Sequence, residues 1–334
     1  MSLSVVIPTL NETAALPRLL ADLRAQTGLT LEIIVADGGS TDATREHAAR
    51  LGAKLIRAPR GRGAQMNAGA AAATYDSLLF LHADTRLESP TLLADAQHAL
   101  RVAGDDRVAG HFPLRFARTQ PGHEFLFRYA EGKTRSNRRY TINGDQGLLI
   151  SRKYFSELGG YDTRLLFLED QRFSTRIFAT GRWLLLPGEL VTSARRFESE
   201  GHAERYALMA LMMGAYAVGL DEFFEQAPHA YRAQNETQKL NVEAFAALVR
   251  KLIRAKGWDG WRTLYRGGRF VRENAWQLFY RRDLIRNDGR DSALRFHDRW
   301  FASLVSNPLG NTLAMLLLVI WLYGVLPRTA KNAL

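Results

Sequence analysis

The run LLFLHADT, residues 78–85, is apolar for four residues and then turns polar at His82. Such a run is too short and too apolar for anything but a buried strand. Its Asp84 then stands at the carboxyl end of that strand, where open α/β sheets bind their ligands. One such acid means little by itself, because Asp commonly ends strands and caps helices.

Two more apolar runs end in acids. Residues 31–36 stop at Asp37, and residues 165–168 stop at Glu169 and Asp170. We interpret both runs as buried strands that end at the same edge of one sheet. Several acids at one edge favour a site that combines a metal, a nucleotide and a general base.

Strand and helix signals alternate over the first 200 residues, and we expect strands at 4–7, 31–36, 54–56 and 77–81. Helical patterns lie between them: one over residues 16–23, one that residues 40–42 cap and that runs to about residue 51, and one over residues 65–73. This order predicts an α/β fold with a mostly parallel sheet flanked by helices. Strand signals then fade, and we expect a mainly helical C-terminal region.

The charge distribution divides the second part of the chain. The whole chain has a net charge of +11 and no cysteine, which excludes disulfides and cysteine-based metal sites. Residues 251–300 contain 13 Lys or Arg against 6 Asp or Glu, interleaved with Trp, Tyr and Phe. We therefore expect a catalytic domain over 1–200, a basic aromatic helical region over 201–304 and an apolar segment over 305–334.

The basic aromatic region suits an anionic membrane surface, although single-stranded nucleic acid would suit it too. We favour the membrane and expect no nucleic-acid partner. Residues 309–326 contain no formal charge, and 18 residues of helix span about 27 Å, just short of a hydrocarbon core of ~30 Å. We predict that this segment spans the membrane or enters and leaves it on the cytoplasmic side; the alternative is a buried helix.

Several motifs, taken in order, resemble glycosyltransferase family 2. They are residues 4–12 (SVVIPTLNE), 35–42 (VADGGSTD), 62–69 (RGAQMNAG), 82–84 (HAD), 144–147 (GDQG) and 169–170 (ED). A bacterial subgroup of the family also carries a motif like residues 194–197 (ARRF). The resemblance implies a GT-A fold, a nucleotide-sugar donor, a divalent metal and inversion at the anomeric carbon.

The donor side is expected at the first strand ends. Pro8, Thr9 and Glu12 would line the base and ribose pocket, with Glu12 equally suited to a capping box. Asp37 can accept a ring N–H of the base, which favours UDP, or it can cap the following helix. Six further residues would contact the phosphates of the donor. They lie at the start of a helix, in the metal motif and after the sheet: Arg62, Gln65, Asn67, His82, Ala83 and Arg196. The alternative for the first of these is a solvated basic loop.

The metal, the base and the acceptor side complete the expected site. Asp84 is the expected ligand for Mn²⁺ or Mg²⁺. His82 replaces the usual first Asp, and it binds the metal, contacts phosphate or only packs. Asp170 is the expected general base, with Glu169 orienting a neighbour; the two acids would also complement a helix dipole. The resemblance places Gly144, Asp145 and Gln146 on the acceptor side.

The sequence thus favours transfer of a sugar to a membrane-associated or lipid-linked acceptor of the bacterial cell envelope. One alternative is a nucleotidyltransferase, but the loop after the first strand lacks the expected glycine-rich stretch with a reactive Arg or Lys. The other alternative is a non-catalytic basic protein that binds membrane or nucleic acid, and this gives no reason for acids at strand ends. The sugar and the oligomeric state are left open by the sequence.

Overall fold

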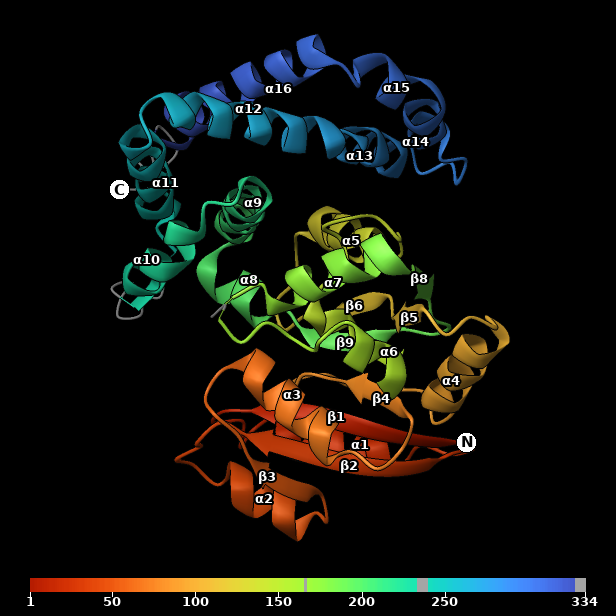
Figure 1. Cartoon of the computed structure of the whole chain (residues 1–334). Coiled ribbons are helices and arrows are strands. Elements are labelled where there is room, and N and C mark those ends of the chain that lie inside the picture. The colour runs from red at the N-terminus through yellow and green to blue at the C-terminus, as the bar shows by residue number, and fades with distance from the viewer. Residues whose placement is uncertain (165–166, 233–239, 328–334) are drawn as a thin grey trace. The chain divides into compact units, whose positions relative to one another are not determined.

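The computed structural model describes residues 1–164, 167–232 and 240–327. The chain divides into two compact units, Met1–Ala194 and Arg195–Leu334. In the described chain, all strands belong to the first unit and the second unit is helical (Figure 1). The sequence placed its boundary six residues further on, at residue 200. Each unit is described by itself below.

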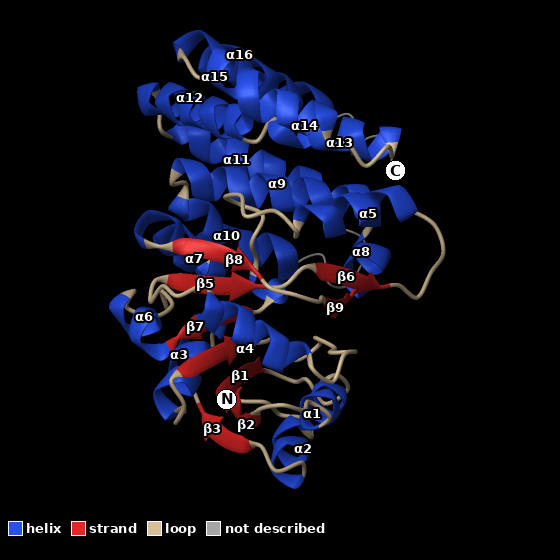
Figure 2. Cartoon of the chain, turned by 90° about the vertical axis from the view of Figure 1, so that its right-hand side faces the viewer, coloured by secondary structure: helices blue, strands red, loops and turns tan. Residues whose placement is uncertain are grey.

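The first unit is built on a seven-stranded sheet with the order β3-β2-β1-β4-β7-β5-β8. All neighbouring pairs are parallel except the two that involve β7, which runs antiparallel to β4 and β5 (Figure 2). The predicted α/β class with a mostly parallel sheet is therefore confirmed. The strands are β1 (Ser2–Thr9), β2 (Thr30–Asp37), β3 (Lys54–Arg57), β4 (Ser77–Phe80), β5 (Val108–His111), β7 (Leu148–Ser151) and β8 (Arg182–Leu185).

Helices cover both faces of this sheet, and each face has its own apolar core. On one face α1 (Leu16–Arg24), α2 (Thr44–Arg50) and α4 (Leu92–Val102) pack against alternate residues of β1 such as Val5 and Ile7. On the other face α3 (Arg62–Ala72), α6 (Arg152–Glu157) and α7 (Glu169–Thr180) pack around Val6 and Phe80. Burying each such side chain contributes about 1.5–3 kcal/mol, which favours this three-layer arrangement.

Helix α3 lies very close to β1. A side-chain methyl group added to Gly69 would overlap the side chain of Val6. Only glycine therefore allows α3 to lie this near the sheet. The approach brings the first turn of α3 to the carboxyl ends of β1 and β2, where Gln65 contacts both strands.

The first unit also contains two short strands, a helix and a 3-10 turn outside the layers described above. Two short strands, β6 (Leu114–Ala117) and β9 (Leu190–Ser193), pair in parallel as a separate sheet. Helix α5 (Glu124–Lys133) and a 3-10 turn, η1 (Gly144–Gln146), lie between β6 and β7 in the chain. These elements had no counterpart in the sequence-based prediction.

One local prediction agrees with the structure and one was wrong. The sequence placed residues 40–42 as the cap of the second helix, and α2 begins at Thr44, whose backbone N–H donates to Asp42 Oδ1 (3.0 Å). Ser40 and Asp42 also accept hydrogen bonds from the loop after β1: Asn11 N to Ser40 Oγ is 2.9 Å and Thr13 N to Asp42 Oδ2 is 3.2 Å. The strand expected over 165–168 falls partly on Leu165 and Leu166, which lie outside the described residues. Phe167 is exposed in a bend rather than buried in a strand.

The described residues of the second unit form helices. They are α8 (Arg195–Glu200), α9 (His202–Val218), α10 (Asp221–Arg232), α11 (Val242–Ala255), α12 (Trp258–Glu273), α13 (Trp276–Arg286), α14 (Ser292–Phe296), α15 (Ala302–Val305) and α16 (Pro308–Ile320). Two π-helical turns, η2 (His297–Phe301) and η3 (Trp321–Val325), continue α14 and α16. Helix α12 packs along both α9 and α16, so the unit has an apolar interior of its own.

Candidate active site

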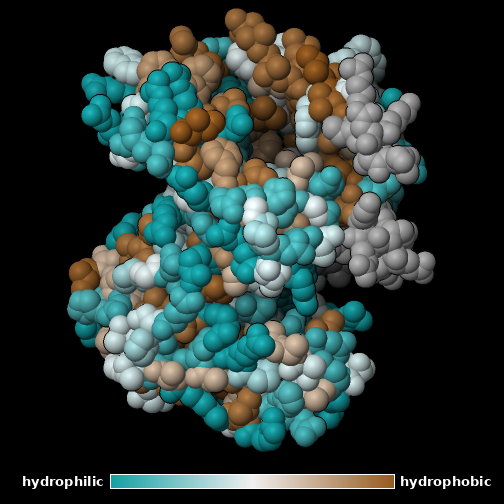
Figure 3. All heavy atoms as spheres, turned by 180° about the vertical axis from the view of Figure 1, so that it is seen from behind, coloured by the Kyte–Doolittle hydropathy of each residue, from teal (hydrophilic) through white to brown (hydrophobic). Residues whose placement is uncertain are grey.

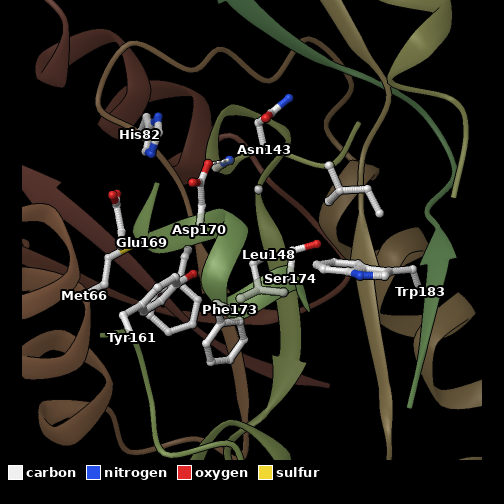
Figure 4. Close-up of a pocket in the computed structure, with 14 residues that line it drawn as sticks. Met66, His82, Asn143, Leu148, Tyr161, Glu169, Asp170, Phe173, Ser174 and Trp183 are labelled. Carbon is white, nitrogen blue, oxygen red and sulfur yellow. Dashed lines mark hydrogen bonds between the residues drawn. The ribbon is translucent and has the colours of Figure 1, made fainter. Parts of the chain in front are cut away.

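Asp170 stands at the start of α7, and its carboxylate is held on two sides. Asp170 Oδ2 accepts a hydrogen bond from the backbone N–H of Gly144 (2.7 Å), and Oδ1 accepts one from Gln171 N (2.7 Å). Leu168, just before the helix, has a φ of 59°, which turns the chain sharply into α7. The turn points the half-buried acid toward η1 (Figure 4).

Glu169 differs from its neighbour because it is buried and paired. Its carboxylate lies 3.3 Å from Arg62 Nη1, the first residue of α3. Burial acts to lower the pKa of Arg62, but Glu169, Asp145 and Asp170 outweigh it and raise that pKa. The pair therefore joins α3 to α7 across the site and keeps positive charge beside both acids.

The electrostatics of Asp170 suit a group that exchanges protons near neutral pH. Burial, and then the charge of Glu169, raise the pKa of Asp170 to about 6, against the opposing effects of the Gly144 amide and Arg62. The same two acids, after burial, raise the pKa of Tyr161 well above its usual value, so its phenol stays neutral. Perturbed acids of this kind concentrate at functional sites.

His82 faces Asp170 from the loop after β4. Its Nδ1 lies 2.6 Å from Asp145 Oδ1, while its buried Nε2 has no hydrogen-bond partner among the described residues. A methyl group built on Gly144 would lie 3.0 Å from His82 Nε2 and 3.4 Å from Asp170 Oδ2. The absence of a side chain at Gly144 thus leaves room for both the imidazole and the carboxylate.

These side chains open into one pocket that has a polar end and an apolar end. His82, Glu169 and Asp170 lie at the polar end, and Phe173 and Trp183 lie further in (Figure 4). The buried Nε1 of Trp183 is a second donor with no partner in the described chain. The pocket is lined by Met66, Phe80, His82, Ile142, Asn143, Gly144, Gly147, Leu148, Tyr161, Glu169, Asp170, Phe173, Ser174 and Trp183.

The predicted nucleotide residues meet at the ends of β1 and β2. Thr9 lies opposite Asp37 in the parallel register, one residue beyond Pro8. The Asp37 carboxylate is almost fully buried and accepts hydrogen bonds from Gly39 N (3.2 Å), from Ser40 N (3.1 Å) and from the Ser40 hydroxyl. Asp37 therefore orders the turn after β2, and it does not cap the next helix, which begins only at Thr44.

The two amides predicted to contact the donor bind the protein backbone instead. Gln65 Nε2 donates to Thr9 O (2.7 Å) and Ala36 O (2.9 Å). Asn67 Nδ2 donates to Tyr161 O, and its Oδ1 accepts from Tyr161 N, both at 2.8 Å. Both amides position the site: Gln65 joins two strand ends, and Asn67 fixes the loop that carries Tyr161.

The other predicted residues occupy varied places. Half-buried Glu12 begins the turn into α1, and its backbone N–H donates to Thr44 Oγ1 (2.7 Å). Ala83 is buried behind His82. Gln146 is fully buried, bonded to His111 Nδ1 (3.0 Å) and Thr141 O (2.6 Å), so it supports η1 from behind.

Arg196 belongs to the second unit. It is exposed in α8 of the second unit, so it is not among the residues that the first unit brings together. Asp145 is exposed at the rim of η1 and reaches His82. The structure therefore gathers His82, Asp145, Glu169, Asp170 and Arg62 around Gly144.

The fit of a metal depends on Asp84 and His82. In the part of the chain that the structure describes, no group of three or more His, Cys, Asp or Glu side chains is placed to hold an ion. Asp84 is exposed, and the buried His82 Nε2 has no partner among those same residues. The carboxylate of Asp84 is the type of ligand that Mg²⁺ or Mn²⁺ takes, and the imidazole nitrogen of His82 would suit Mn²⁺ better than Mg²⁺. Either ion would take further ligands from phosphate and water.

The sequence did not reveal several pocket residues. Tyr161, Asn143, Ser174 and Trp183 line the pocket, but none belongs to a recognised motif. Asn143 precedes the GDQG motif directly, and Gln171 Nε2 donates to its Oδ1 (2.9 Å). Of these four residues, only Asn143 could have been suspected from the sequence, because it lies next to a motif.

Comparison with known proteins gives the family. Residues 4–159 match the sequence model described as "Glycosyl transferase family 2". A "PGL/p-HBAD biosynthesis glycosyltransferase" of Mycobacterium bovis is 33% identical over 185 residues, which cover 53% of this chain and 69% of that protein. An uncharacterized glycosyltransferase of Nostoc sp. is 36% identical over 91 residues, covering 25% of this chain and 28% of its own.

The chain is also similar to solved structures. The structure of S. aureus TarS residues 1–349 in complex with UDP has a TM-score of 0.49 and 15% identity, covering 90% of this chain and 91% of that one. The same fragment in complex with UDP-GlcNAc has a TM-score of 0.49 and 16% identity, covering 90% of this chain and 92% of that one.

The mostly parallel sheet, the acids at its edge and the family match agree with one another. This chain belongs to glycosyltransferase family 2. The resemblance seen in the sequence is therefore confirmed, and so is the GT-A type of its α/β fold.

Proposed function

We propose that this chain transfers a sugar from a nucleotide-sugar to a hydroxyl group of a membrane-associated or lipid-linked acceptor, with inversion at the anomeric carbon. The observation that carries the proposal is Asp170, a half-buried carboxylate with a raised pKa at the mouth of a pocket. The unpartnered ring N–H of Trp183 in the described pocket suits a ligand rich in hydroxyl groups.

The reaction needs a single base. The acceptor oxygen bonds to the anomeric carbon while the bond from that carbon to the diphosphate breaks. The hydroxyl proton passes to Asp170, and the electron pair leaves with the nucleoside diphosphate. Glu169 is paired with Arg62, so it positions α3 against α7 and tunes Asp170 rather than accepting the proton.

We assign the metal to Asp84, with His82 Nε2 as a second ligand. When bound, Mn²⁺ or Mg²⁺ would supply neutralisation of the negative charge on the diphosphate. Arg62 contributes fixed positive charge near the same acids, because its ion pair with Glu169 holds it at the site.

We propose UDP as the nucleotide, with its base held at the ends of β1 and β2. Thr9 and Asp37 lie side by side there. The Asp37 carboxylate would accept the uracil ring N–H in exchange for one of its bonds to Ser40 or Gly39. Gln65 supports that edge by joining both strands.

The acceptor proposal rests on the second unit. Among the described residues, one helix, Pro308–Val325, is long and apolar enough to cross a membrane, and 17% of that stretch is buried. Together with the basic residues of α12 and α13, it supports association with the cytoplasmic face of a membrane, peripheral or anchored by residues 309–326.

The test is Asp170→Asn, assayed with UDP-sugars and membrane lipids. We expect turnover to fall by ~10²–10⁴-fold with little change in donor affinity, the usual scale for losing a general base. Asp76→Asn, an exposed acid at the opposite end of β4, is the matched control. Loss of donor binding instead would move Asp170 into the nucleotide pocket, and release of pyrophosphate rather than UDP would favour a nucleotidyltransferase.

A further inference from the structure

Helix α16 has an exposed apolar face and a packed face. Leu309, Leu313, Leu316, Leu317 and Ile320 are all exposed, and their spacing places them on one side of the helix. Ala314, between them in sequence, is buried. Figure 3 shows hydrophobic side chains gathered over this C-terminal region of the chain. One side of the helix is therefore packed against the protein, and the other side exposes an apolar surface.

The packed face is fixed to α12 along its length. A methyl group on Gly267 would lie 2.6 Å from Leu318 Cδ2, and one on Gly268 would lie 2.6 Å from Met315 N. Asn311 Nδ2 donates to Tyr265 Oη (3.1 Å). Such close backbone approach over several turns makes the two antiparallel helices one rigid pair, visible side by side in Figure 1.

Helix α12 is not suited to the interior of a bilayer. Its exposed side carries Arg262, Arg266 and Arg269, with Asp259 and Glu273 as ion-pair partners of two of them. If α16 crossed the membrane, the paired α12 would bring these charges to the same depth. Charged side chains in the hydrocarbon interior are costly, whereas arginines at the surface gain from anionic lipids.

The neighbouring exposed residues are of the kind found at membrane surfaces. Phe296, Trp300 and Leu304 are exposed at a spacing of four residues on the helix that precedes α16, and the Arg299 guanidinium lies 5.4 Å from the Trp300 ring centre. Trp258 is 89% exposed at the start of α12. Tryptophan beside arginine is typical of the interface between headgroups and acyl chains.

We infer that α16 lies side-on in one leaflet of an anionic membrane, parallel to its plane, and does not cross it. The stripe from Leu309 to Ile320 would enter the acyl chains, and α12 would lie on the water side with its arginines among the headgroups. This inference rests on the proposed membrane association and specifies its geometry. A helix in this position would hold the chain at the surface without a membrane-spanning segment.

The chain contains no cysteine, so single cysteines can report depth without background. We would introduce L309C, L313C and I320C on the exposed stripe and A314C on the buried side, label each with a small fluorophore, and bind the full chain to vesicles of phosphatidylserine and phosphatidylcholine. Depth is then measured with lipids that carry quenchers at known positions. Circular dichroism and UDP binding confirm that each variant is folded.

We expect the three stripe positions to report one shallow depth in the acyl region and A314C to label poorly. A spanning helix would instead place Leu309 and Ile320 about 16 Å apart in depth, from 11 residues at 1.5 Å each, and that result would overturn the inference. If the protein binds vesicles but the stripe positions lie at increasing depths, the proposed membrane association still holds and only the in-plane geometry is wrong. Absence of vesicle binding, or stripe cysteines that crosslink two copies in solution, would overturn both.

Discussion

Two adjacent acids acquire different chemistry from their surroundings. Glu169 is buried against Arg62, so its negative charge is balanced, whereas Asp170 faces the pocket and is stabilised chiefly by the Gly144 amide. Burial, and then the negative charge of Glu169, raise the pKa of the neighbouring Asp170, whereas the Gly144 amide and Arg62 lower it. How readily the proposed base accepts a proton therefore depends on the balance between these groups, and Arg62 is one that a substitution can remove.

Replacing that arginine should shift the pH dependence. Asp170 works as a base when ionised, so the rate should fall below its pKa, which burial and then Glu169 raise to about 6. In Arg62→Met the lowering effect of the guanidinium is lost, and the acidic limb of the kcat profile should move to higher pH. Arg60→Met, an exposed neighbour, is the control. An unmoved limb in the Arg62 variant would show that another group titrates.

Asp84 can be tested at the same scale. It is exposed, so Asp84→Asn should leave the fold unchanged while abolishing turnover and manganese-dependent UDP binding. Isothermal titration with and without Mn²⁺ measures this directly. Asp76→Asn removes an equally exposed carboxylate before the same strand and should bind normally. Wild-type metal dependence in the Asp84 variant would remove Asp84 as a ligand.

At the scale of elements, α3 joins the fold to the site. Gly69 lets it lie against Val6, which brings Gln65 to two strand ends, Arg62 to Glu169 and Asn67 to the Tyr161 loop. One helix therefore positions groups from four separate segments. A shift of its axis would disturb the whole site together.

Gly69→Ala should destabilise the first unit despite the better helix propensity of alanine. Overpacking a methyl group against Val6 costs about 1–3 kcal/mol, measurable by urea unfolding. In a Val6→Ala background the space exists, so the same change should cost much less. Equal costs in both backgrounds would show that α3 does not approach β1 as closely as described.

The sequence revealed elements whose pattern is local and missed those set by distant partners. The runs that form β1, β2 and β4 are apolar and end in polar residues, so each could be predicted alone. The four-residue strands β5 to β9 are defined by pairing, such as β7 inserted antiparallel between β4 and β5. The run at 165–168 has strand-like composition, but Phe167 is exposed before α7.

Site residues could likewise be predicted where the signal is local and were missed where it depends on distant partners. The acids at strand and helix ends could be identified individually, because carboxylates at such positions are informative without knowledge of the fold. Gln65 and Asn67 were interpreted as donor ligands, yet their amides bind backbone groups of Thr9 and Tyr161. Trp183 enters the pocket from β8, whose place in the sheet depends on β5. No local pattern contains that information.

At the scale of the whole molecule, the chain combines a sugar-transfer unit with a helical unit of different surface chemistry. The first unit presents a pocket with acids at one end, and the second presents exposed Trp, Leu and Arg. A nucleotide-sugar is soluble, whereas a lipid-linked acceptor is confined to a membrane. An enzyme that joins the two therefore benefits from residence at the surface where its acceptor lies.

Membrane binding should involve both charge and burial. Each Lys or Arg near anionic lipid contributes about 1 kcal/mol, which salt screens, whereas the apolar stripe of α16 is not screened. We therefore expect high salt to leave the wild-type protein bound to phosphatidylserine vesicles. In Leu313→Glu/Leu317→Glu, two exposed leucines worth about 1.5–3 kcal/mol each on burial are lost, and salt should now release the protein. Ser303→Glu adds an acid at another exposed position and should stay bound. Release of the wild type by salt alone, measured by sedimentation, would show that the attachment is purely electrostatic and that α16 does not enter the lipid.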